Sequence, residues 1–217
     1  MIKYFKYIKY ILLLFLIIIL LIYMLCSRRE LTIKDVNNLM IIAHKEDGLI
    51  WGANNLVKDS YLVVCITCNR NDKDFINIMN KTNDMYVFLA YDDSTEFYEE
   101  RNILNRDMKK YLFLKKWDKI VTHNEDGEYG SNEHITINNC VNKLLENKDN
   151  LYYFNNYYST EELEKDSNRL YRLNESELDY KVKLISYLED LDYVNEFRHI
   201  IPYEYFITYK KWGDNDE

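Results

Sequence analysis

The chain has 217 residues, of which 36 are acidic and 28 are basic, so its formal net charge is -8. This charge argues against a nucleic-acid partner, because phosphate binding requires a basic surface. With this length and 47% hydrophobic residues, the chain is expected to form one globular domain behind its N-terminal segment.

The N-terminal segment is strongly apolar. Residues Tyr10–Cys26 carry no charge and are almost all Ile, Leu, Phe and Tyr. A run of ~17 residues is at the short end of what spans a bilayer, and residues 4–26 extend it if Lys6 and Lys9 reach the interface. A cleaved signal peptide is the alternative, but small residues are missing before Arg28. We therefore expect a retained single-pass membrane anchor in residues 1–30, ahead of a domain in residues 31–217.

The orientation of this anchor stays undetermined, because basic residues lie on both sides of the span. They are Lys3, Lys6, Lys9, Arg28, Arg29 and Lys34.

Beyond the anchor, short apolar runs alternate with amphipathic stretches. In chain order we expect strand Leu39–Ala43, helix Ile50–Val57, strand Tyr61–Thr67, helix Phe75–Thr82, strand Met85–Ala90, helix Glu96–Trp117, strand Lys119–Thr122, helix Asn132–Glu146, strand Leu151–Asn155, helix Ser176–Leu191 and strand Tyr203–Tyr209. This rhythm predicts an α/β, Rossmann-like fold with a mostly parallel sheet and helices on both faces.

Polar residues follow the first predicted strand directly. His44, Glu46 and Asp47 lie where the strand leaves the sheet, and Gly48 and Gly52 follow as the chain turns into a helix. In open α/β sheets, sites form at the carboxyl ends of strands. This cluster can bind a divalent metal and leave one carboxylate for proton transfer. From these residues alone, a solvated loop remains the alternative.

A second polar stretch follows the strand at Lys119–Thr122. The strand delivers His123, a loop with Gly127 and Gly130 follows, and His134 lies in the first turn of the next helix. The loop is too patterned to be a simple linker.

Cys65 and Cys68 form a Cys-x-x-Cys within and just after an apolar run. They do not lie at a helix N-terminus, where a redox pair would be activated. We expect them to be core and loop thiols.

The stretch His44-Lys45-Glu46-Asp47, taken with His123-Asn124, Gly127-Glu128-Tyr129-Gly130 and His134, resembles the GlcNAc-PI de-N-acetylase family, the PIG-L/LmbE-like zinc deacetylases. Family members carry Ala-His-Pro-Asp-Asp-Glu after the first strand. They also carry a Gly-His-x-x-His element at a later helix start, often preceded by Gly-Glu-Tyr. The likeness runs from about Leu39 to about Leu145.

The resemblance implies a zinc ion held by His44, Asp47 and His134. Three protein ligands with an open fourth position are the pattern of a catalytic zinc site. Glu46 falls where the family has an Asp as general base. Tyr129 matches a family tyrosine that helps to polarise the substrate carbonyl.

The resemblance also places His123, Asn124 and Ser131 toward the substrate, with His123 as a candidate acid. Ser131 replaces a family histidine, and an ordinary helix N-cap is its alternative role. A structural role is the alternative for His123. Lys45 replaces the family proline, and Gly48 replaces its third acidic residue, which removes a partner that could orient a metal ligand.

The resemblance thus implies a membrane-anchored, zinc-dependent hydrolase that removes an acetyl group from an N-acetylglucosamine-type sugar on a lipid, glycan or nucleotide carrier. A catalytically degenerate sugar-binding relative is one alternative, given Ser131 and Gly48. A membrane-anchored glycosyltransferase is another, with Asp92 and Asp93 as its metal ligands.

Overall fold

The computed structural model describes residues 13–18, 33, 35–92, 101–165 and 170–213, and the chain divides into two compact units, Met1–Asp35 and Val36–Glu217. Most of the predicted anchor, residues 4–26, lies outside the described residues, and residues 13–18 are helical. Among the described residues, no helix is long and apolar enough to cross a bilayer. The anchor and the predicted boundary at residue 30 stay predictions.

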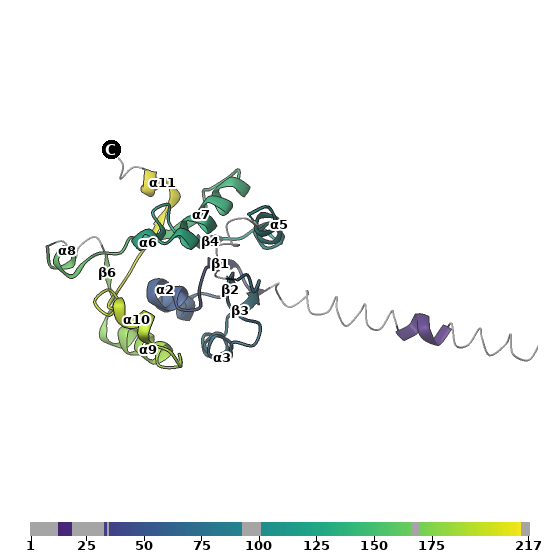
Figure 1. Ribbon diagram of the computed structural model, residues 1–217, viewed down its shortest axis with the longest axis horizontal. Helices are drawn as coiled ribbons and strands as arrows, with labels where there is room; N and C mark the ends of the chain where they lie inside the picture. The colour runs from purple at the N-terminus through teal and green to yellow at the C-terminus, as the bar shows by residue number, and fades with distance from the viewer. Residues whose placement is uncertain (1–12, 19–32, 34, 93–100, 166–169, 214–217) are drawn as a thin grey trace, which may run out of the picture. The chain divides into compact units, whose positions relative to one another are not determined.

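A six-stranded sheet forms the centre of the Val36–Glu217 unit (Figure 1). Its strands lie in the order β3 (Met85–Phe88), β2 (Tyr61–Cys65), β1 (Asn38–Ile42), β4 (Lys119–Thr122), β5 (Leu151–Phe154) and β8 (Phe206–Thr208). The first five strands are parallel to their neighbours, and β8 runs antiparallel to β5. The predicted α/β fold with a mostly parallel sheet is confirmed.

Helices cover both faces of this sheet (Figure 1). Alternate β1 residues, Met40 and Ile42, belong to a buried cluster with α2 (Asp47–Lys58), α3 (Lys73–Thr82) and α9 (Glu175–Ile185). On the other face lie α5 (Arg101–Leu112) and α7 (Asn132–Leu144), and α7 contacts β1 and β4. Strands covered on both faces bury successive residues, which explains their continuous apolar runs.

The strand order reverses between β1 and β4. The chain adds β2 and β3 on one side of β1 and then returns to place β4 on the other side. In such sheets, ligands bind outside the carboxyl ends of the strands at the reversal. The loops after Ile42 and Thr122 therefore meet at the place where this fold builds sites.

The C-terminal part differs from the sequence prediction. The expected strand Tyr203–Tyr209 is divided, because β7 (Tyr203–Glu204) pairs with β6 (Tyr171–Arg172) in a separate small sheet, while β8 joins the main sheet. The expected helix Ser176–Leu191 ends at Ile185, and a separate α10 (Asp192–Glu196) follows. Among the described residues of this unit, the other helices are α6 (Gly127–Gly130), α8 (Thr160–Lys165) and α11 (Tyr209–Gly213). Of the expected helix Glu96–Trp117, residues 96–100 lie outside the described residues.

Helix α2 is broken at Gly52 (φ -152°, ψ 18°). At this break, the Ile50 carbonyl and the Asn54 N–H form hydrogen bonds with side chains outside the helix. Nζ of the buried Lys181 donates to the Ile50 carbonyl at 2.7 Å, and the Asn54 N–H donates to Glu204 Oε1 at 3.0 Å. Lys181 and Glu204 also form a buried ion pair at 3.0 Å. This pair replaces the hydrogen bonds that the helix loses at its break.

Candidate metal centre

The first two predicted ligands lie in the turn that joins β1 to α2. Asp47 is the first residue of α2 and is fully buried, and a carboxylate in the first turn of a helix is favoured by the helix dipole. Its Oδ2 accepts the backbone N–H of His44 at 2.7 Å and lies 3.6 Å from His44 Nδ1. The turn therefore brings both side chains to the carboxyl end of β1.

The third predicted ligand arrives from the start of α7. Ser131 caps this helix, because its hydroxyl accepts the backbone N–H of His134 at 3.3 Å. The capping role considered for Ser131 is thus confirmed. The cap presents His134 in the first turn, fully buried, with Nε2 3.4 Å from Asp47 Oδ1.

These three residues fit a zinc ion. Potential donor atoms of His44, Asp47 and His134 all lie within 4.8 Å of one another. Two ligands ~2.1 Å from a tetrahedral zinc ion would lie ~3.4 Å apart, close to the His134–Asp47 separation. Within the part of the chain that the structure describes, Asp47 Oδ1 and His134 Nε2 are buried without a hydrogen-bond partner. Buried polar atoms are rarely left so, and a metal ion would satisfy both.

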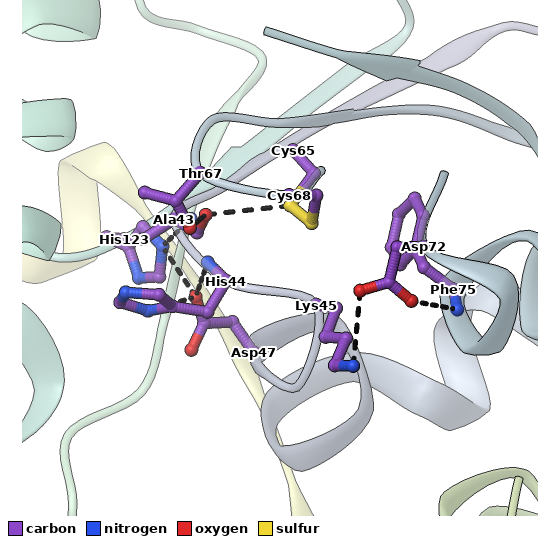
Figure 2. The surroundings of a disulfide bond; sticks show 10 residues. All are labelled: Ala43, His44, Lys45, Asp47, Cys65, Thr67, Cys68, Asp72, Phe75 and His123. Carbon is purple, nitrogen blue, oxygen red and sulfur yellow. Dashed lines mark hydrogen bonds and ion pairs between the residues drawn. A yellow bond between two sulfur atoms is a disulfide. The ribbon is translucent and has the colours of Figure 1, made fainter. Parts of the chain in front are cut away.

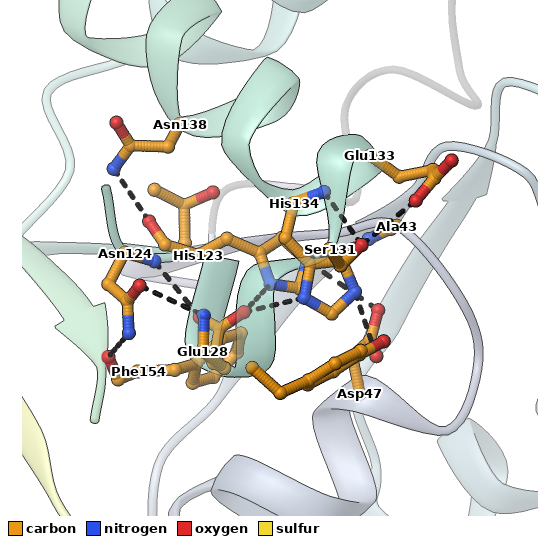
Figure 3. Close-up of polar contacts among 12 residues, drawn as sticks. Ala43, Asp47, His123, Asn124, Glu128, Ser131, Glu133, His134, Asn138 and Phe154 are labelled. Atoms are coloured by element: carbon orange, nitrogen blue, oxygen red, sulfur yellow. Dashed lines mark hydrogen bonds and ion pairs between the residues drawn. The ribbon is translucent and has the colours of Figure 1, made fainter. Parts of the chain in front are cut away.

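A buried carboxylate orients His134 from behind (Figure 3). Glu128 Oε2 accepts from His134 Nδ1 at 2.5 Å and from His123 Nδ1 at 3.0 Å. Its Oε1 accepts the backbone N–H of Asn124 at 2.9 Å. When Nδ1 of His134 carries the proton that bonds Glu128, Nε2 offers its lone pair toward Asp47. Carboxylates commonly hold metal-binding histidines in this way.

The loop that carries Glu128 requires unusual backbone angles. Glu128 itself has φ of 59°, and Asn124 Oδ1 stabilises the turn by accepting the N–H groups of Asp126 and Glu128, each at 3.0 Å. Gly127 has φ of 64°, and a Cβ there would lie 2.9 Å from Ile135 Cγ1. Strained backbone of this kind is characteristic of functional sites.

His123 joins the ends of the two central strands. Its Nε2 accepts the backbone N–H of Ala43 at 3.0 Å, so the ring is a neutral imidazole whose Nδ1–H donates to Glu128. The ring stacks on His134 with centroids 3.7 Å apart. Both nitrogens are thus engaged inside the protein. In the structure, His123 therefore packs against His134 and helps to hold its ring in place.

The charges in this cluster shift one another's pKa values. Burial alone would raise the pKa of Asp47, but His134 holds it well below its usual range. Burial would lower the pKa of His134, yet Asp47 and Glu128 raise it to about 10 in the metal-free protein. Burial would also raise the pKa of Glu128, which His123 and His134 instead lower. Burial and the charge of His134 lower the pKa of His123.

A pocket opens beside His44, one of the three predicted ligands. It has a volume of about 350 Å³ and is lined by His44, Glu46, Glu133 and Tyr193. Burial raises the pKa of Glu46, and a higher pKa makes a carboxylate a stronger general base. The hydroxyls of Tyr129 and Tyr193 lie 2.5 Å apart at its edge. The pocket wall therefore combines one predicted metal ligand, two carboxylates and the phenol of Tyr193.

The predicted residues are placed as follows. The structure brings together His44, Asp47 and His134, places Glu46 in the pocket wall and leaves Tyr129 40% exposed beside it. His123 and Asn124 are fully buried, and Asn124 donates to the Phe154 carbonyl at 3.1 Å. Their predicted contact with substrate, and the roles of the other site residues, stay predictions.

Two residues of the site were not predicted from the sequence. Glu128 belongs to the Gly-Glu-Tyr-Gly stretch, and its position between two glycines after a strand is a signal for such a role. Tyr193 comes from α10, and no motif marks it.

The structure shows what surrounds Gly48 and Lys45, two positions where the chain departs from the family pattern. A Cβ at Gly48 would meet side-chain atoms of Leu56, Ile42 and Met40 at 3.6–3.7 Å, so a carboxylate there would point into apolar surroundings. The Glu of the Gly-Glu-Tyr pattern, Glu128, is kept and supplies an orienting carboxylate to His134. Lys45 forms an ion pair with Asp72 at 3.2 Å (Figure 2). It forms a second ion pair with Asp74 at 3.5 Å, and both pairs tie the loop to the start of α3.

The glycosyltransferase alternative gains no support. Asp92 is exposed beyond β3, an edge strand two positions from the reversal between β1 and β4, and Asp93 lies outside the described residues.

Comparison with known proteins gives one sequence relative and several structural ones. No family model matches the chain. An uncharacterised protein, L374 of Acanthamoeba polyphaga mimivirus, is 32% identical over 147 residues, which are 57% of this chain. The chain spans 63% of the length of that relative.

The structural neighbours are deacetylases of low sequence identity. The N,N'-diacetylchitobiose deacetylase from Pyrococcus horikoshii, solved with an inhibitor, has a TM-score of 0.55 and 13% identity, covering 77% of this chain and 78% of its own. A triple mutant of a teicoplanin-pathway deacetylase has a TM-score of 0.54 and 10% identity, covering 76% and 89%. The zinc-inhibited form of the teicoplanin deacetylase has a TM-score of 0.50 and 9% identity, covering 69% and 83%. The resemblance predicted from the sequence is therefore confirmed: this chain has the fold of the PIG-L/LmbE-like deacetylases.

Proposed function

We propose that this protein is a zinc-dependent amide hydrolase that removes the acetyl group from an N-acetylglucosamine-type sugar. The observation that carries the proposal is the convergence of His44, Asp47 and His134 beside an open pocket whose wall includes His44 and Glu46. Two imidazoles and one carboxylate are a common catalytic zinc set. A zinc ion held there would act as a Lewis acid and lower the pKa of bound water to ~7.

The protein's own residues would carry the proton transfers. Glu46 takes the proton of the attacking water and then delivers it to the nitrogen of the leaving amine, which requires no second acid. The Tyr129 hydroxyl donates a hydrogen bond to the oxygen that becomes negative as the acetyl carbonyl is attacked. Burial raises the pKa of Tyr129 to about 12, so the phenol keeps its proton at neutral pH.

A saccharide substrate agrees with the walls of the pocket. Tyr193 presents an aromatic ring, and Glu133, with Glu46, presents carboxylate oxygens that can accept sugar hydroxyls. The structural neighbour from Pyrococcus horikoshii is named a deacetylase of N,N'-diacetylchitobiose, which makes this disaccharide a suitable first substrate.

The sugar-binding alternative is weakened by Glu128. The sequence motivated it by the losses at Ser131 and Gly48, yet the structure retains a buried carboxylate on His134. If zinc-loaded wild type releases no acetate while Ser131→His does, the alternative holds.

The proposal retains an N-terminal membrane anchor in residues 4–26, supported by the uncharged run Tyr10–Cys26. Recovery of the full chain with membranes, and of a chain lacking residues 1–30 in the supernatant, would support it. Equal partition of both chains would contradict it.

The decisive experiment measures acetate release from N,N'-diacetylchitobiose. The full-length protein is loaded with one equivalent of zinc, since the teicoplanin deacetylase has a zinc-inhibited form. Glu46→Gln should lower kcat by about 10²–10⁴-fold while metal content is unchanged. Glu125→Gln, an exposed carboxylate in a nearby loop, is the matched control and should retain activity. Equal activity of Glu46→Gln and wild type would refute the proposed role.

A further inference from the structure

The loop after β2 holds a disulfide against the metal-binding turn (Figure 2). Cys65 ends β2 and is bonded to Cys68, and the Cα atoms lie 5.5 Å apart. The expectation of two thiols is therefore corrected: the parallel pairing of β1 and β2 places the bridge beside Ala43, the residue before His44.

Thr67, inside the bridged loop, binds the Ala43 carbonyl twice. Its backbone N–H donates to that oxygen at 3.0 Å, and its hydroxyl donates at 2.9 Å. The Ile66 N–H donates to the Ile42 carbonyl at 2.9 Å. On its other side, the Ala43 N–H is held by His123. Both backbone groups of Ala43 are thus fixed directly before His44.

The oxidised and reduced loops would hold Ala43 differently. In the disulfide, Cys65 Sγ carries no hydrogen and lies 3.5 Å from the Ala43 oxygen. A reduced Cys65 thiol at this place could donate to the same oxygen and compete with Thr67. Reduction would also release Cys68 and with it one end of the loop. A switch requires such a difference in contacts between its two states.

We propose that Thr67, held by the Cys65–Cys68 bridge, is a positioning residue for His44, so that reduction of the bridge weakens metal binding. The inference rests on the metal centre of the proposed function. Its co-reactant is a dithiol: one thiolate attacks Sγ of Cys68, the more exposed of the two at 6%, and expels the Cys65 thiolate. The second thiol of the reductant then displaces Cys68. Two cysteine thiols and one cyclic disulfide result, and two protons and two electrons pass to the protein.

The test is a titration of the full-length protein with Co²⁺, followed through its visible absorption. Wild type is measured oxidised, and again after reduction with dithiothreitol and its removal without air. We expect the reduced protein to bind Co²⁺ about tenfold more weakly, the range seen when a group supporting a metal ligand is lost. Equal affinity in the two states would overturn the proposal.

Variants distinguish the loss of the bridge, which would misplace His44, from metal binding by the free cysteine thiols. Cys65→Ala/Cys68→Ala removes the bridge without adding thiol ligands, and it should bind Co²⁺ as weakly as the reduced protein. Cys140→Ala, which alters a buried cysteine outside the bridge, is the control and should bind like wild type. Double-variant affinity equal to wild type would overturn the proposal.

Thr67 gives a test that does not disturb the bridge. Thr67→Val keeps the side-chain shape but loses the hydroxyl and should weaken Co²⁺ binding, whereas Thr67→Ser should restore it. Unchanged binding by Thr67→Val would refute the positioning role. If no variant or redox state binds Co²⁺, the metal centre itself fails; if all bind equally, only the present inference fails.

Discussion

Glu128 Oε2 lies 2.5 Å from Nδ1 of His134, and this contact determines which nitrogen of His134 faces Asp47. The Glu128→Gln variant removes the charge but keeps the shape. We expect about 10–100-fold weaker metal binding, because support for the ligand ring is reduced. Isothermal titration with Zn²⁺ measures the change. Glu125→Gln, an exposed change three residues earlier, should bind like wild type, and equal affinities for both variants would contradict the role of Glu128.

Metal binding should strengthen with rising pH. In the metal-free protein the pKa of His134 is raised to about 10, so a proton occupies the ring at neutral pH and a metal must displace it. Affinity should rise about tenfold per pH unit between pH 7 and 9, with one proton released. Titrations in buffers of different ionisation enthalpy measure this release. A flat profile would contradict the prediction.

The same shift has a consequence for the stability of the metal-free protein. The folded-state pKa of His134 is above its ordinary 6.5, so its stabilising contribution is complete below pH 6.5 and is lost as pH rises through about 10. Urea unfolding of wild type should therefore show declining stability between these limits, and His134→Gln should show a smaller decline.

The ion pair at the break of α2 predicts a stability effect away from the site. Lys181→Met leaves the charge of Glu204 buried without its partner, so the free energy of unfolding should fall by about 3–5 kcal/mol. Urea unfolding measures the loss. Lys183→Met, two residues along the same helix and exposed, should cost much less. Similar losses in both variants would show that the pair does not support the break.

Tyr193 should affect substrate binding more than catalysis. Tyr193→Ala removes the ring from the pocket wall and should raise KM for N,N'-diacetylchitobiose about tenfold, the size of one aromatic contact. Tyr193→Phe keeps the ring and should lie closer to wild type. Tyr180→Ala, a partly exposed tyrosine on α9, is the control. An unchanged KM in Tyr193→Ala would contradict this role.

The local sequence pattern is sufficient to predict some elements and site residues of this protein but not others. The buried strands, and His44 and Asp47 directly after the first of them, could be located because apolar runs and polar strand ends are visible over a few residues. His134 joined the predicted metal ligands through the resemblance to the deacetylase family. The role of Glu128 is harder to predict from the sequence, because only the fold shows that Glu128 is buried while Glu125 is exposed.

Long-range pairing explains the remaining differences. The split of Tyr203–Tyr209 between two sheets depends on partners far away in sequence, β6 for one half and β5 for the other. Tyr193 reaches the pocket only because the C-terminal helices return to the strand ends. The Cys65–Cys68 bridge depends on the turn after β2, which the apolar pattern did not reveal.

The central claim is that His44, Asp47 and His134 bind one metal ion together. Metal analysis of the purified full-length protein, after loading with zinc and dialysis, tests this most directly. We predict one equivalent of zinc in wild type and in His199→Ala, whose imidazole bonds the Tyr158 carbonyl instead, and almost none in His134→Ala. Full zinc content in His134→Ala, or none in wild type, would contradict the account.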